Sequence, residues 1–148
     1  MKPGSFYNNL GIGAFAISAV LSNAGFLTFP RLMLILPIVA HRGMVKQLSH
    51  ARFRFIGFEQ YFIEHAEFFY NFGERYTANL APTVNALQLL NEIRALKLQN
   101  GGAASLTPIP IDKAMGNRAD RIHRASANIA DLISGSTEIF YLNSRIEL

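Results

Sequence analysis

Residues 82–111 read PTVNALQLLNEIRALKLQNGGAASLTPIPI and carry the clearest indication of the architecture. The first half of this stretch repeats apolar side chains at helical spacing, through Val84, Leu87, Leu90 and Ile93. Pro82 is favoured in the first turn of a helix, and Asn79 just before it is a capping residue type. We therefore predict a helix over 82–96.

The second half of the stretch changes character. Leu96-Lys97-Leu98 alternates, and Asn100-Gly101-Gly102 is typical of a tight turn between two antiparallel strands. The prolines Pro108 and Pro110 cannot donate backbone hydrogen bonds, so we place the second strand at a sheet edge. A helix followed directly by a hairpin is the outline of a winged helix.

Helical patterns extend on both sides of this unit. They predict helices over 12–23, 30–40, 58–76, 117–133 and 136–142. Pro37 should kink the second of these or mark its last turns, and Gly73 should break the third. Between them, 41–54 is predicted as a short, basic connection. The sequence thus predicts a mainly α fold, a compact multi-helix domain over 1–148 with a single β-hairpin wing.

The stretch from Phe58 to Tyr76 places aromatic side chains at helical spacing. Aromatic side chains can stack nucleobases, but proteins that use them so interleave basic residues. Here the interleaved charges are acidic, for example Glu64 and Glu67. We interpret the stripe as part of the core.

Twenty residues from Leu10 to Phe29 carry no formal charge, which is enough to span a bilayer. A secretory signal is a second alternative, with Lys2 as its basic end and Ser22-Asn23-Ala24 as a cleavage site. Gly11, Gly13 and several other small or polar residues weaken the interpretation as a membrane span. We expect a buried helix of a cytoplasmic protein here.

The composition favours a subunit that other proteins cover. The chain of 148 residues is 50% hydrophobic but only 16% charged, whereas an ordinary domain has about 25% charged residues. Such a surface leaves apolar area for partners. The absence of cysteine excludes disulfides, thiol nucleophiles and zinc–cysteine sites.

Motifs for catalysis are missing from the sequence. It contains no phosphate-binding loop, no dinucleotide fingerprint and no nucleophile elbow. The four histidines and three aspartates are scattered, with no pair at zinc-ligand spacing. We therefore expect no enzymatic activity, no cofactor, no metal and no small-molecule substrate.

Positive charge is concentrated in two places. No acidic residue precedes Glu59, and the chain has a net charge of +4. The first basic set is Arg42, Lys46, Arg52 and Arg54, and a second, weaker set is Arg118, Arg121 and Arg124. The first set is a candidate contact for an acidic protein partner or for DNA phosphates, with a solvated loop as the alternative. The second has the spacing of an ordinary solvated helix face.

Five segments, taken in order, resemble one protein family. They are Phe29–His41 with its Leu-Pro-Ile-Val core, Phe72-Gly73-Glu74-Arg75-Tyr76, Thr83–Leu87, the hairpin at Leu96–Ile109, and Ser136–Leu142 with Arg145. Together they resemble the middle components of ABC-three-component systems, and in particular the small middle subunit of the Lamassu anti-phage system. The similarity extends over about residues 6–146 and departs from the family at Asn143-Ser144.

This resemblance implies a role in a larger assembly. Middle components are placed between an SMC- or Rad50-like ABC ATPase and an effector, commonly a nuclease. The chain would then be a non-catalytic bridging subunit of a bacterial anti-phage or anti-plasmid complex that meets DNA through its partners. A DNA-binding winged-helix module is the alternative, and a membrane protein anchored by residues 10–29 is a third.

Overall fold

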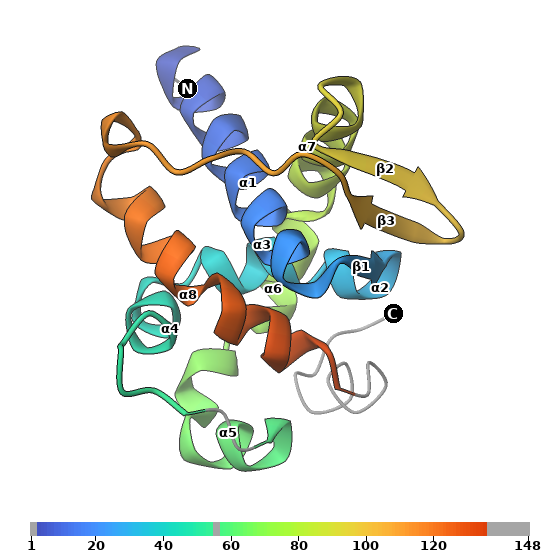
Figure 1. The fold of residues 1–148 in the computed structure, drawn as a ribbon. Helices are drawn as coiled ribbons and strands as arrows, with labels where there is room; N and C mark the ends of the chain where they lie inside the picture. The colour runs from blue at the N-terminus through green and yellow to red at the C-terminus, as the bar shows by residue number, and fades with distance from the viewer. Residues whose placement is uncertain (1–2, 55–56, 136–148) are drawn as a thin grey trace.

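The structure is a computed structural model, and it describes residues 3–54 and 57–135. A long helix, α1 (Pro3–Ala24), runs through the middle of the molecule, and α8 (Asn117–Ile133) crosses it (Figure 1). Side chains from Ala14 to Leu21 are buried in the core. The predicted buried N-terminal helix is thereby confirmed. None of the described helices combines the length and the hydropathy needed to cross a membrane.

The predicted hairpin is present next to α1. Strands β2 (Leu96–Gln99) and β3 (Gly102–Ser105) are antiparallel. Asn100 and Gly101 between them both have positive φ, 50° and 73°. Two consecutive positive φ angles are the requirement of a type I′ turn, which Asn-Gly meets at low cost.

A third strand, β1 (Phe26–Thr28), completes a sheet in the order β1-β3-β2. The second strand of the hairpin is therefore central, and our prediction of an edge strand was wrong. It ends at Ser105, before Pro108 and Pro110, so neither proline has to donate to the ladder. Three residues are too few for β1 to show an alternating pattern in the sequence. The fold is mainly α with one small antiparallel sheet, as predicted.

The apolar segment after β1 contains two short helices in place of the one predicted over 30–40. These are α2 (Phe29–Leu32), which buries only Leu32, and α3 (Ile35–Val39), which is buried along its whole length. Pro37 is the third residue of α3, where its missing N–H is one that no helical carbonyl would accept. In one continuous helix over 30–40, however, Pro37 would lack its bond to the Met33 carbonyl, and the helix breaks there, at Met33-Leu34, so the kink predicted at this proline is a complete break one turn before it. The basic connection after it is also partly helical, because α4 spans Arg42–Leu48.

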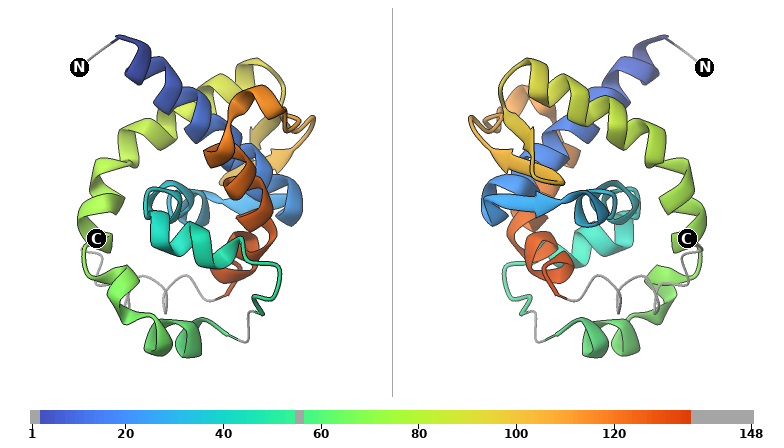
Figure 2. Two further views of the ribbon diagram at one scale, coloured as in Figure 1. Left: turned by 90° about the vertical axis from the view of Figure 1, so that its left-hand side faces the viewer. Right: turned by 90° about the vertical axis from the view of Figure 1, so that its right-hand side faces the viewer.

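The aromatic stretch forms an arm of α5 (Phe58–Glu64), a 3₁₀ turn η1 (Ala66–Phe69) and α6 (Phe72–Ala78). Together with α7, the arm curves around the side of the molecule that holds α3 and α4 (Figure 2). Tyr61, Phe69 and Phe72 are buried, which confirms the core interpretation. The breaks lie at His65 and Tyr70-Asn71, whereas Gly73 lies inside α6, so the predicted break was wrong.

The helix before the hairpin, α7, spans Leu80–Glu92. It is shorter than predicted because Arg94 adopts a left-handed conformation, with φ of 62°, and turns the chain into β2. Asn79 stands at the capping position, but its side chain donates to the Arg75 carbonyl and does not cap α7. A 3₁₀ turn η2 (Lys113–Met115) leads into α8, which was predicted correctly. The predicted helix over 136–142 lies outside the described residues.

Candidate anion-binding surface

The packing of α4 against α8 brings the two basic sets together. α8 buries Ala119, Ile122 and Ala125 toward the core. Further along the helix, the Asn128 side chain donates to the Leu48 carbonyl at the end of α4, at 2.8 Å. This bond satisfies one of the carbonyls that a helix leaves open at its C-terminus. It also fixes α4 beside α8.

Three arginines meet where these two helices begin. Arg42 from the start of α4 and Arg118 and Arg121 from the start of α8 line a hollow of about 190 Å³. Its floor is apolar and consists of Val39, Val45 and Ile122. We call this site the arginine hollow.

The guanidinium groups of the arginine hollow are exposed and have no ion pair or hydrogen bond within the part of the chain that the structure describes. Every ionisable group that lines the hollow is an arginine. Guanidinium groups bind carboxylates and phosphates through paired hydrogen bonds. The hollow is therefore suited to an acidic side chain or a phosphate of a partner molecule.

The remaining residues of the two basic sets lie elsewhere. Lys46 is exposed on α4, and Arg52 and Arg54 are exposed in the connection that follows it. Arg54 lines a separate small depression that also contains Glu64. Arg124 forms an ion pair with Asp120 at 2.8 Å. In the sequence, each basic set consists of residues that are close to one another along the chain. Nothing in that pattern indicates that Arg42 lies beside Arg118 and Arg121 in the fold.

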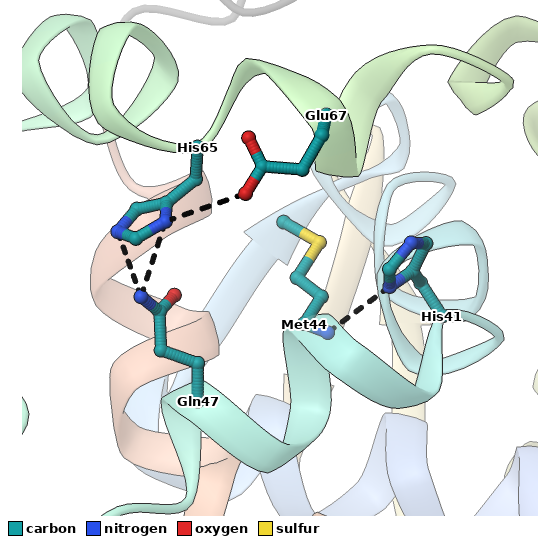
Figure 3. A network of polar contacts seen from close by, with 5 residues as sticks. All are labelled: His41, Met44, Gln47, His65 and Glu67. Atoms are coloured by element: carbon teal, nitrogen blue, oxygen red, sulfur yellow. Dashed lines mark hydrogen bonds and ion pairs between the residues drawn. The ribbon is translucent and has the colours of Figure 1, made fainter.

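A second polar cluster fixes α4 from its other side (Figure 3). His41 caps α4, because its Nδ1 accepts the Met44 backbone N–H at 3.0 Å. Further along α4, Gln47 Nε2 lies 2.7 Å from His65 Nε2. The other nitrogen of His65 lies 3.9 Å from a carboxylate oxygen of Glu67. The cluster thus connects α4 to the aromatic arm, and it was not predicted.

The protonation of His41 matters for this cap. An Nδ1 that accepts a hydrogen bond cannot carry a proton. Burial, and after it the positive charge of Arg75, lower the pKa of His41. The imidazole is therefore kept in the neutral form that caps the helix, and its ring lies against Phe68, with 5.1 Å between ring centroids.

Arg75 in α6 is a basic residue with a purely internal set of partners. Its Nε donates to the Pro37 carbonyl at 3.1 Å and one terminal nitrogen donates to the Phe68 carbonyl at 2.7 Å. Its guanidinium carbon also lies 5.2 Å from the centroid of the Phe72 ring. Arg75 thereby joins two of the segments that carry the family resemblance, Phe72–Tyr76 and Phe29–His41.

Comparison with known protein families decides the affiliation. Residues 18–142 match the family of ABC-three component (ABC-3C) system Middle Component 3. The chain belongs to this family. No curated protein and no solved structure matches it.

The ABC-3C middle component resemblance seen in the sequence is thereby confirmed at the level of the family. The segments that carry it lie in α2 and α3, in α6, in α7 and in the hairpin, while Ser136–Leu142 and Arg145 lie outside the described residues. Within the described parts of this middle component, no group of three His, Asp or Glu side chains could hold a metal ion. What the described surface does offer is the arginine hollow.

Proposed function

We propose that this middle component is a non-catalytic bridging subunit. It links an SMC- or Rad50-like ABC ATPase to an effector, a nuclease, in a cytoplasmic bacterial complex of the Lamassu kind that acts against phages or plasmids. The family match over residues 18–142 carries the proposal, because a middle component of a three-component system has protein partners. The arginine hollow supports it as a contact for an acidic surface on one of those partners.

Co-expression tests the proposal directly. The chain is produced alone, and with the ABC ATPase and effector proposed as its partners, and each preparation is run on a sizing column. We expect the chain to aggregate alone and to co-elute with both partners when they are present. A well-behaved monomer that co-elutes with neither partner would overturn the proposal.

Charge reversal in the same experiment tests the arginine hollow. Arg42→Glu, Arg118→Glu and Arg121→Glu together should reduce co-elution with one partner, because like charges then face each other. The matched control reverses Lys46, Arg52 and Arg54, which lie outside the hollow. If both triple variants behave alike, net charge and not the hollow determines assembly.

A winged-helix DNA-binding module is the second candidate, and the order of elements favours it. The hairpin directly follows α7, and β1, which lies between α1 and α2, extends its sheet. The exposed face of α7, however, offers Asn85, Gln88 and Glu92 and none of the arginines expected of a recognition helix. This leaves the arginine hollow as the phosphate contact for such a module.

Titration with duplex DNA separates the two candidates. A DNA-binding module should lose affinity steeply between low and moderate salt, because phosphate contacts release counterions. Alanine at Arg42, Arg118 and Arg121 should weaken binding to all sequences alike. Binding that is absent, or unchanged by salt, would exclude this candidate.

A further inference from the structure

An apolar groove lies directly beside the arginine hollow. Its volume is about 400 Å³, and its walls come from α1, from α3 and from the junction of α6 and α7. The residues that line it include Leu10, Ile12, Leu36, Val39, Asn85 and Arg118. Val39 and Arg118 line the arginine hollow too, so the two depressions form one continuous surface.

We propose that this composite surface is the docking site for an acidic amphipathic helix of a protein partner. Apolar side chains of that helix would fill the groove, and its Asp or Glu side chains would bind Arg118 and the other arginines of the hollow. The inference rests on the proposed function, because a bridging subunit needs such a site, and it specifies the chemistry of the partner.

Charge and shape together point to this occupant. Helices bind in grooves through apolar anchors repeated at i, i+3, i+4 and i+7, and the described walls of the groove are themselves mainly apolar. At one end of the groove, Arg118 leads into a hollow whose ionisable lining residues are all arginines. A helix with an apolar stripe bordered by carboxylates complements both parts.

A nucleic acid fits the composite surface less well. Proteins that bind single strands stack the bases on aromatic rings, and the described lining of the groove contains no aromatic side chain. Duplex DNA would reach the arginines but leave the apolar groove open. Protein is therefore the class of partner that uses the whole surface.

A pair of designed peptides tests the proposal without the natural partners. The first peptide is a dye-labelled helix of about 15 residues, long enough to be partly helical, with leucines at i, i+3, i+4 and i+7 and glutamates beside them. Its twin carries lysine in place of each glutamate. We expect fluorescence anisotropy to show binding of the glutamate peptide and binding of its twin about tenfold weaker or worse.

Two substitutions locate the binding. Asn85→Trp fills the groove from the exposed side of α7, and Gln88→Trp on the same helix is its control, because Gln88 does not line the groove. Arg118→Glu reverses the charge between groove and hollow, and Arg124→Glu on the same helix is its control. We expect Asn85→Trp and Arg118→Glu each to weaken binding about tenfold and the controls to stay within about twofold.

Three results would overturn the proposal. The first is no binding of the glutamate peptide, and the second is equal binding of its lysine twin. The third is unchanged binding by Asn85→Trp while circular dichroism shows the variant to be folded.

The peptide result is independent of the proposed function. If the chain co-elutes with its ATPase and effector but binds neither peptide, the docking surface is refuted and the bridging role stands. If the glutamate peptide binds but no partner co-elutes, the bridging role is refuted and the surface remains.

Discussion

Arginine serves opposite purposes on α6 and on α8. Arg75 of α6 is half-buried and donates to the carbonyls of Pro37 and Phe68, so its charge is used to hold the aromatic arm against α3. Arg118 and Arg121 of α8 are exposed and have no polar partner in the described part of the molecule. The same side chain is therefore a structural element in one region and an available cation in the other.

The difference shows what makes a basic residue a candidate for binding. Membership of one helix does not decide it, because Arg121 and Arg124 both lie on α8, yet of these two only Arg124 has an ion pair among the described residues, with Asp120. What decides it is whether the fold already supplies acceptors. Substitutions on α6 should therefore change stability, and substitutions at the start of α8 should change binding.

The largest effect on stability is expected for Arg75→Met. The substitution removes the two hydrogen bonds that the charged guanidinium donates. The carbonyls of Pro37 and Phe68 then lose this donor. We expect the free energy of unfolding to fall by about 3 kcal/mol, and the midpoint of thermal unfolding by about 10 °C. Urea and thermal unfolding followed by circular dichroism measure both.

Arg75→Lys is the matched control for charge. Lysine keeps the positive charge but lacks the planar fork that serves two carbonyls at once, so we expect an intermediate loss of stability. A change below about 0.5 kcal/mol for Arg75→Met would mean that Arg75 behaves like an ordinary surface residue. The distinction between α6 and α8 would then fail.

Local patterns in the sequence predicted much of the fold. The periodicity of α8, the apolar stretch of α1 and the Asn-Gly turn of the hairpin each report on their own neighbourhood, and each was confirmed. The predictions that failed concern features that depend on contacts between distant segments of the chain. β1 exists because Phe26–Thr28 pairs with β3, and that pairing makes β3 central. No pattern within three residues reveals such a partner.

The sequence predicted that the candidate site would consist of basic residues, but it did not predict which of them would lie together. Both basic sets were evident as charge clusters, yet the arginine hollow takes Arg42 from one and Arg118 and Arg121 from the other. Their meeting depends on the packing of α4 against α8, which the sequence does not specify. Arg124 differs because it is paired with Asp120, four residues before it on α8, and this spacing is one that the sequence does show.

The hydrogen bond between Asn128 of α8 and Leu48 of α4 provides the next test. Asn128→Ala removes the hydrogen bond to the Leu48 carbonyl, and we expect the free energy of unfolding to fall by about 1 kcal/mol. Arg124→Ala on the same helix removes only an exposed ion pair and should cost about 0.5 kcal/mol or less. Urea unfolding of both variants measures the difference. Equal losses of unfolding free energy in the two variants would show that the hydrogen bond from Asn128 does not hold α4 in place.

The cap of α4 should make stability depend on pH. The pKa of His41 in the folded chain is lowered, so the unfolded chain takes up the proton first as the pH falls below about 6.5. The stabilisation is therefore present above that pH and is lost below it. Two charged groups act on the imidazole in opposite directions: Arg75 lowers its pKa and Glu67 raises it.

His41→Asn isolates this effect, because asparagine caps helices well and does not titrate. Urea midpoints at pH 7.5 and pH 5.5 should differ less for the variant than for the unmodified chain. All other residues are identical in the two proteins, so their contributions to the pH dependence cancel in the comparison. Parallel losses in the two proteins would show that the His41 cap does not contribute to the pH dependence.

The smallest effect on stability is expected for the arginines of α8. Arg118→Glu and Arg121→Glu should each change the free energy of unfolding by no more than about 0.5 kcal/mol, because neither guanidinium has a described partner to lose. A glutamate at position 118 is even favoured, since it lies in the first turn of α8, where the helix dipole attracts negative charge. Urea unfolding of these two variants and of Arg75→Met under the same conditions compares their free energies of unfolding. A loss as large as that of Arg75→Met would mean that these arginines too are satisfied within the fold, and the hollow would then have no free cation to offer a partner.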